Sequence, residues 1–162
     1  MSKLIATFFY SGHMKPAPGT WGSLAALPAA YGISLIGGWL ALLIAACIAY
    51  VIGHWATKAE TAGKGNHDPS EIVIDEVVGQ WIALLPVIYG AQFASVSFLA
   101  LWPGWIAAFV LFRFFDITKL GPVGWADKRD DATGVMLDDV VAGVLAAIGV
   151  VLLGILYHVV MF

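Results

Sequence analysis

Charged side chains are scarce in this sequence. They make up 12% of its 162 residues, whereas 60% of the residues are hydrophobic. Soluble domains carry about 25% charged residues, so this composition excludes a water-soluble globular domain and is typical of an integral membrane protein. The length leaves room for one domain, which we predict to cover residues 1–162. The few basic residues do not form the basic patches of a nucleic-acid-binding protein, and we expect no such partner.

Several signatures of other enzyme classes are missing as well. Cys47 is the only cysteine and lies inside an apolar run, which excludes a disulfide framework and argues against a thiol phosphatase. The sequence has no glycine-rich phosphate-binding loop that ends in Lys-Ser or Lys-Thr. It also lacks the Asp-x-Asp pair of aspartyl-phosphate enzymes.

Three long uncharged runs cover residues 16–57, 77–112 and 140–162. A membrane helix needs about 20 residues, so the first run must hold two helices, and Gly37 and Gly38 are the natural break. The second run is predicted to fold back within residues 90–97. The predicted fold is therefore an all-α, polytopic membrane helical bundle of about five apolar segments, in two hairpins plus a C-terminal helix. The segments are predicted near residues 22–36, 39–56, 72–89, 98–115 and 138–161.

These hairpins define a topology. Each returns the chain to the side it left, so residues 1–21, 57–76 and 113–139 are predicted to share one membrane face. All eight Lys and Arg residues and all eleven Asp and Glu residues lie on that face or at its edge. Because basic loops favour the cytoplasm, we predict that the acidic loops are cytoplasmic and that the C-terminus is outside.

Two acidic pairs stand at the ends of uncharged runs and follow one pattern. Asp75 and Glu76 precede Val-Val-Gly, and Asp138 and Asp139 precede Val-Val-Ala-Gly. Carboxylates at a membrane edge are costly unless a cation intervenes. The glycines at 79 and 143 would let another backbone approach closely. We interpret the two pairs as facing each other across a divalent metal ion.

Neighbouring residues could extend this site. Asp68-Pro69-Ser70-Glu71 is predicted to start a helix, with Asp68 at the N-cap. Glu71 then shares a helix face with Asp75, and this like-charge spacing again favours a bound cation. Asp68 could serve only as a cap.

A helical turn would align Arg113, Asp116 and Lys119. Arg113 is either a phosphate-binding cation or a snorkelling side chain paired with Asp116. We interpret Asp116 as a metal ligand and Lys119 as a phosphate-binding residue. Before the first apolar segment, Gly19, Thr20, Gly22 and Ser23 could present N–H groups to an anion, although a rigid proline turn with a helix cap explains them equally well.

An all-oxygen set of acidic ligands suits Mg²⁺, or Mn²⁺, and not Zn²⁺. Such an ion would neutralise and polarise a phosphate and could activate a water molecule. Whether water attacks directly or a carboxylate first forms a phosphoryl-enzyme is left open by the sequence.

Together, these residues resemble the phosphatidylglycerophosphatase A family. Four blocks occur in the family's order: residues 17–23, residues 68–79, residues 115–119 and residues 134–143. The resemblance implies a Mg²⁺-dependent phosphatase that converts phosphatidylglycerophosphate to phosphatidylglycerol, with its active site on the cytoplasmic face of a bacterial inner membrane. Leu120 follows Lys119 where the family usually has proline.

The resulting assignment covers three roles, with membrane lipid as the partner and no obligate protein partner evident. The expected metal ligands are Glu71, Asp75, Glu76, Asp116, Asp138 and Asp139. The expected catalytic residues are Asp75, Asp138, Asp139 and Lys119. The expected substrate-binding residues are Gly19, Thr20, Gly22, Ser23, Arg113 and Lys119.

Two other functions fit the sequence less well. A cation transporter or channel would place acids at mid-span and on both sides of the membrane, and this sequence does not. A lipid headgroup transferase of the CDP-alcohol type would carry an Asp-Gly-x-x-Ala-Arg signature, which is absent.

Overall fold

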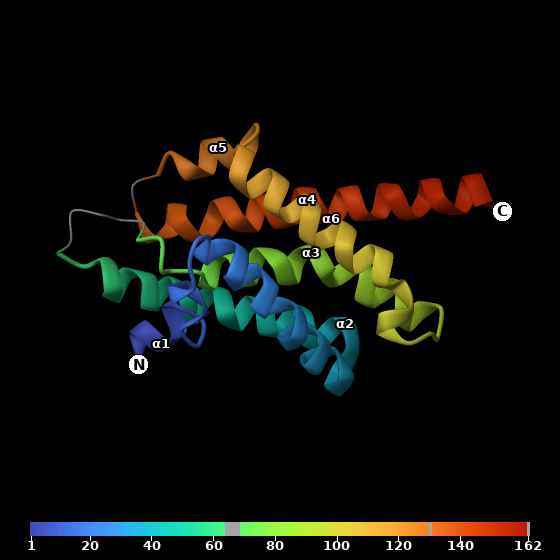
Figure 1. Ribbon diagram of the computed structural model, residues 1–162, viewed down its shortest axis with the longest axis horizontal. Coiled ribbons are helices and arrows are strands. Elements are labelled where there is room, and N and C mark those ends of the chain that lie inside the picture. The colour runs from blue at the N-terminus through green and yellow to red at the C-terminus, as the bar shows by residue number, and fades with distance from the viewer. Residues whose placement is uncertain (64–68, 130, 162) are drawn as a thin grey trace.

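The computed structural model describes residues 1–63, 69–129 and 131–161, so Asp68 lies outside the described residues. Within these ranges the chain is helical and contains no strand, which confirms the predicted all-α class (Figure 1). The elements in order are α1 (Ser2–Ala6), η1 (Ser11–His13), α2 (Pro18–Thr61), α3 (Ile74–Phe93), η2 (Phe98–Leu101), α4 (Trp102–Thr118), α5 (Pro122–Asp127) and α6 (Ala132–Met161).

Among the described residues, four helical stretches are long and apolar enough to cross a membrane, namely Pro18–Thr61, Ile74–Phe93, Phe98–Thr118 and Ala132–Val160. The first is not one straight helix. Its backbone leaves the helical region at Gly37 and Gly38, where Gly38 has a φ of +63°, a region that favours glycine. Figure 1 shows α2 reversing direction there, so the predicted break is confirmed and the chain has five apolar segments. The backbone N–H of Trp39 donates to Gln92 Oε1 at 3.3 Å, which ties this break to the end of α3.

Three helices begin elsewhere than predicted. α2 begins at Pro18, so residues 19–23 are its first turns and not a loop before it. α3 begins at Ile74, and residues 69–73 are not helical, so the predicted helix start at residues 68–71 is wrong. α6 begins at Ala132 and not near residue 138. As a consequence, Asp138 and Asp139 lie inside a helix and not at its entrance.

Asp131 explains the early start of α6. Its Oδ1 atom accepts a hydrogen bond from the Gly134 N–H at 2.7 Å, and its carbonyl accepts the Val135 N–H at 3.2 Å. These are the two bonds of a helix N-cap residue, which stabilises the first turn by satisfying an otherwise unpaired N–H group. The loop before α6 also contains the short helix α5, which the sequence did not predict.

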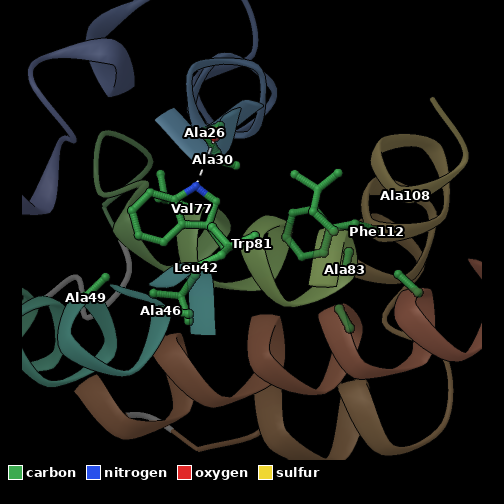
Figure 2. Close-up of a cluster of buried hydrophobic side chains, with 14 of the residues drawn as sticks. Ala26, Ala30, Leu42, Ala46, Ala49, Val77, Trp81, Ala83, Ala108 and Phe112 are labelled. Carbon is green, nitrogen blue, oxygen red and sulfur yellow. Dashed lines mark hydrogen bonds between the residues drawn. The ribbon is translucent and has the colours of Figure 1, made fainter. Parts of the chain in front are cut away.

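Small residues let the helices pack closely around α3. Figure 2 shows Trp81 of α3 between the two arms of α2, with its indole Nε1 donating to the Ala26 carbonyl at 2.9 Å. A buried tryptophan N–H needs such an acceptor. On the other side of α3, Phe112 of α4 is fully buried (Figure 2). These contacts hold α2 and α4 against α3.

Two glycines bring α3 and α6 into backbone contact. A β-carbon at Gly143 would lie 3.0 Å from the Cα atom of Gly79, and a β-carbon at Gly79 would lie 2.5 Å from the Asp139 carbonyl oxygen. The prediction that these glycines permit close approach is confirmed: Gly143 lies against the backbone of Gly79, and Gly79 lies against Phe112 and the backbone of Asp139. Because Asp75 and Asp139 each lie one helical turn before such a glycine, the crossing brings the two acidic pairs together.

The charged segments of the described chain gather at one end of the bundle. In Figure 1 the start of α2, its end, the start of α3, α5 and the start of α6 lie together, whereas the turn in α2, the turn after α3 and the C-terminus lie at the opposite end. The Val73 N–H donates to the Ala6 carbonyl at 2.8 Å, and Ser2 Oγ donates to Glu60 Oε1 at 2.6 Å. This arrangement agrees with the predicted hairpin topology.

Candidate active site

A cavity of about 370 Å³ lies at the charged end of the bundle. It is formed by the start of α2, the segment before α3, and α3, α4 and α6. Its lining residues are Ala17, Pro18, Gly19, Ser70, Ile72, Asp75, Glu76, Arg113, Asp116, Ile117, Lys119, Val135, Asp138 and Asp139. Residues far apart in the sequence therefore meet in one cavity, which polar and apolar side chains line together.

Five carboxylates line this cavity, and among the described residues they form two overlapping sets. Asp75, Glu76 and Asp139 form one set, and Asp116, Asp138 and Asp139 form the other. Within each set, one oxygen from each residue lies within 4.8 Å of the others, a spacing that could hold a metal ion. All four aspartates are buried, and Asp139 is only 2% exposed.

Two cations bind the acids on the α4 side. Arg113 Nη1 donates to Asp116 Oδ2 at 2.5 Å, and Lys119 Nζ donates to Asp116 Oδ1 at 3.3 Å. The predicted alignment of these three residues by one helical turn is thus confirmed. Lys119 also forms an ion pair with Asp138 of α6, and its Nζ lies 3.4 Å from Asp127 Oδ1. Lys119 therefore joins α4, α5 and α6.

The same carboxylates determine the charge state of Lys119. Burial alone would lower the pKa of this ammonium group, but the negative charges of Asp139, Asp138 and Asp116 outweigh that effect and raise its pKa well above the usual range. Lys119 is consequently positively charged at any physiological pH and can bind an anion.

The acids on the α3 side of the cavity, namely Asp75 and Glu76 of α3 and the adjacent Asp139 of α6, include two oxygens without hydrogen bonds. Glu76 Oε2 and Asp139 Oδ1 are buried and have no hydrogen-bond partner among the described residues. Leaving a buried carboxylate oxygen unpaired is costly unless a cation compensates it. These oxygens fit a bound metal ion, because a hard divalent cation takes carboxylate oxygens as ligands.

The amino end of α2 adds N–H donors to the cavity. Ala17 is the N-cap residue, and no side chain caps the helix. Its carbonyl accepts the Trp21 N–H at 3.1 Å, so the N–H groups of Gly19 and Thr20 precede the first intrahelical bond. A β-carbon at Gly19 would lie 3.2 Å from Arg113 Nη1. Gly19 thus lets this helix end approach the basic side of the cavity.

Eight of the predicted site residues line the cavity: Gly19, Asp75, Glu76, Arg113, Asp116, Lys119, Asp138 and Asp139. The other four, Thr20, Gly22, Ser23 and Glu71, do not line it.

Local structure explains why three of these residues, Gly22, Ser23 and Glu71, lie elsewhere. A β-carbon at Gly22 would lie 2.6 Å from Val73 Cβ, so this glycine serves the packing of α2. Ser23 is buried, and its Oγ atom donates to the Gly19 carbonyl at 2.9 Å. Glu71 is exposed, because residues 69–73 are not helical and its side chain does not share a face with Asp75.

The contact between Asp127 and Lys119 was not predicted. It depends on the unpredicted helix α5, which folds the chain back toward α4. The apolar lining residues Ile72, Ile117 and Val135 lie inside three of the four blocks of the resemblance, but no role in the site was predicted for them.

A family model described as phosphatidylglycerophosphatase A matches residues 4–154 of the chain. The chain belongs to this family. A phosphatidylglycerophosphatase A from Haemophilus influenzae is 40% identical over 147 residues, which cover 90% of this chain and 83% of the relative. A phosphatidylglycerophosphatase A from Escherichia coli K12 is 36% identical over 162 residues, which cover 96% of this chain and 81% of the relative.

A third relative, from Bacteroides thetaiotaomicron, is 38% identical over 149 residues, covering 90% of this chain and 88% of the relative. It is provisionally named a phosphatidylinositol-3-phosphatase. The comparison with solved structures gave no match.

Family membership confirms the resemblance seen in the sequence. The family's activity is that of a phosphomonoesterase of phospholipid biosynthesis, and the four long apolar stretches agree with a multi-pass membrane enzyme. Membership also decides against the transporter and transferase alternatives. The family name implies phosphatidylglycerophosphate as the substrate.

Proposed function

We propose that the cavity at the charged end of the bundle is the active site in which phosphatidylglycerophosphate is hydrolysed to phosphatidylglycerol and phosphate. One observation carries this assignment: a single cavity is lined by five carboxylates and two cations. They come from α3, α4 and α6, and Lys119 is the residue that ends α4. Carboxylates can hold a divalent ion, and Arg113 and Lys119 can bind the phosphate. A lipid phosphatase needs both functions at the edge of a membrane.

The metal is Mg²⁺ in this proposal, with Mn²⁺ as an acceptable substitute, because every available ligand is a carboxylate oxygen. Asp75, Glu76 and Asp139 would hold it, with Asp116 and Asp138 nearby. When bound, such an ion polarises the phosphoryl group and lowers the pKa of a coordinated water. Glu71 has no part in this site, since its side chain is exposed.

The phosphate would lie between Arg113, Lys119 and the amino end of α2. Lys119 supplies a permanent positive charge, and the uncapped N–H group of Gly19 supplies a further donor. These donors stabilise negative charge on the phosphoryl oxygens as it develops in the transition state. Ile117, a lining residue with an exposed side chain, would contact the apolar part of the lipid.

In the reaction, the oxygen of water bonds to phosphorus and the bond from phosphorus to the glycerol oxygen breaks. The proton that the water loses needs a nearby base, and the leaving glycerol oxygen gains one. Asp75, Asp138 and Asp139 are the carboxylates placed to accept the proton, and Lys119 balances their charge. These are the same residues that the sequence assigned to catalysis.

We assign the site to the cytoplasmic face of a bacterial inner membrane. The basic residues of the chain all fall in segments 1–21, 57–76 and 113–139, and basic loops favour the cytoplasm. The two relatives that carry the family name are bacterial proteins. The family match over residues 4–154 supports a single domain over the whole chain. A reporter fused after Phe162 should be external, and a cytoplasmic reading would contradict this topology.

Phosphate release from phosphatidylglycerophosphate in detergent tests the function. The wild type should release phosphate with Mg²⁺ and lose this activity in EDTA. Asp75→Asn and Asp138→Asn should each lower the turnover by about 100-fold or more, the size expected for loss of a group that acts in the transition state. Asp131→Asn, an exposed acid outside the cavity, is the matched control and should keep full activity.

Two results would overturn the proposal. Full turnover by both cavity variants would remove the acids from the reaction, and a wild type that releases no phosphate would disprove the activity itself.

A further inference from the structure

We infer that the five carboxylates have two separate roles, in which Asp75, Glu76 and Asp139 bind a single metal ion, whereas Asp116 and Asp138 hold Arg113 and Lys119 for the phosphate. The inference rests on the proposed function in taking the ion to be Mg²⁺ or Mn²⁺. It goes further by excluding Asp116 and Asp138 from the metal's ligands and by limiting the site to one ion per chain.

The acids on the α4 side already have protein partners. Asp116 accepts from Arg113 at Oδ2 and from Lys119 at Oδ1. Asp138 accepts from Lys119 at Oδ2, and its Oδ1 atom accepts the backbone N–H of Asp139 at 3.0 Å. Every carboxylate oxygen of these two residues therefore accepts a hydrogen bond, and at three of the four oxygens a metal ion would compete with Arg113 or Lys119.

The acids on the α3 side differ in this respect. Asp139 is 2% exposed, and its Oδ1 atom has no hydrogen-bond partner among the described residues. Glu76 Oε2 is also buried without a hydrogen-bond partner among the described residues. One oxygen of Glu76 and one of Asp139 lie within 4.8 Å of an Asp75 oxygen. Buried carboxylate oxygens without donors are costly unless a cation compensates them, and the two cations that line the cavity, Arg113 and Lys119, are engaged by Asp116 and Asp138. We therefore place the ion next to Glu76 Oε2 and Asp139 Oδ1, the buried oxygens without hydrogen bonds.

The helix crossings support the same division. The contact between Gly79 and Gly143 fixes the approach of α3 to α6, and the three proposed ligands lie one turn before these glycines. Lys119 instead fixes the approach of α4 to α6 through Asp138. The glycine contact between α3 and α6 would thus set the position of the metal ion. The ion pair between α4 and α6 would set the position of the phosphate-binding cations.

Thermal unfolding of the full-length protein in detergent separates the two groups without using activity. In EDTA, Glu76→Gln and Asp139→Asn should leave the melting temperature at or above that of the wild type, because without a metal ion the buried Glu76 Oε2 and Asp139 Oδ1 atoms have no hydrogen bond to lose. Asp116→Asn and Asp138→Asn should lower it, because each removes a carboxylate partner of a partly buried cation, Arg113 and Lys119 in the first case and Lys119 in the second. Asp131→Asn is the control and should leave the response to metal unchanged.

Metal binding gives a second measurement on the same five variants. Mn²⁺ titration followed by electron paramagnetic resonance should give one ion per wild-type chain. Glu76→Gln and Asp139→Asn should weaken binding by more than about tenfold and should abolish the rise in melting temperature on adding Mg²⁺, as expected for lost ligands. Asp116→Asn and Asp138→Asn should keep both responses.

The outcomes distinguish this inference from the function beneath it. Equal loss of Mn²⁺ binding in all four cavity variants, or two ions per wild-type chain, would overturn the separation of roles while leaving a metal-dependent phosphatase intact. Normal Mn²⁺ binding without any phosphate release would instead disprove the proposed function. A variant that fails to fold would be recognised by its loss of helical circular dichroism, and the second variant of its pair would then decide.

Discussion

Gly19 at the start of α2 lies directly against the carboxylate of Glu76 on α3. A β-carbon at position 19 would overlap Glu76 Oε1 and would lie 3.2 Å from Arg113 Nη1. With any larger residue at position 19, the Glu76 carboxylate would have to shift away from this helix end. The amino end of α2 is placed by this contact between the proposed metal ligands and the phosphate-binding cations.

Gly19→Ala should lower kcat/KM for phosphatidylglycerophosphate by about 100-fold, because displacing a catalytic group by about 1 Å has effects of this size. Gly32→Ala is the matched control in the same helix, since a β-carbon there meets nothing within 4 Å. The control should keep its activity and gain up to about 1 kcal/mol of stability from better helix propensity. Unchanged kcat/KM in Gly19→Ala would refute the importance of this contact.

Gly143→Ala should separate α3 from α6. Its β-carbon would lie 3.0 Å from Gly79 Cα, and such overpacking costs about 1–3 kcal/mol of unfolding free energy. The affinity for Mg²⁺ should fall in parallel, because the proposed ligands come from both helices. Gly154→Ala in the same helix meets no atom within 4 Å and should change neither quantity. Calorimetry with Mg²⁺ measures both effects, and equal values for the two variants would contradict the prediction.

Lys119 should remain protonated throughout the working pH range, since its pKa is raised by the surrounding carboxylates despite its burial. For a cation with a raised pKa, the stabilising ion pairs are complete below the ordinary lysine pKa and are lost only as the pH rises above the folded pKa. The ratio of kcat/KM between the wild type and Lys119→Arg should therefore stay constant from about pH 7 to 10, because arginine is also always charged. A ratio that changes with pH in this range would show that Lys119 titrates.

Asp131 should stabilise α6 in a pH-dependent manner. The Gly134 N–H and the Arg129 guanidinium hold the pKa of its carboxyl below the usual range. A group with a lowered pKa contributes its stability above the unfolded pKa and loses it as the pH falls through the folded value. Asp131→Ala should thus lower the melting temperature at pH 7, and the difference from the wild type should shrink below about pH 4. An equal difference at both pH values would contradict the capping role.

The order of the helices and hairpins could be predicted because the positions of the charged residues limit where the chain can cross a membrane. Residues 77–112 carry no charge and cannot all lie in one helix, so a hairpin follows from length. The break at Gly37 and Gly38 and the close approach at Gly79 and Gly143 follow from residue size. These features depend on local sequence, which explains why they could be read from it.

The helix starts could not be predicted in the same way. Residues 132–137 suit a helix or a loop equally, and the side chain of Asp131 decides between them by capping Gly134. For Glu71, spacing alone suggested a shared face with Asp75, but the chain from 69 to 73 does not form a helix. The pairing of Lys119 with Asp138 depends on how α4 meets α6, a tertiary relationship with no local signal.

The reversal of α2 at Gly38 has a consequence for biogenesis. Neither Gly37 and Gly38 nor the turn at residues 94–97 carries a charge, so each hairpin can enter the bilayer as a unit without moving a charged side chain across it. Each such transfer would cost about 2.5–3.5 kcal/mol at the bilayer centre. The remaining translocated segment, residues 140–162, also lacks Lys, Arg, Asp and Glu. In the proposed topology, insertion can therefore proceed by partitioning of apolar helices alone, with the charged end kept on the side where the chain is made.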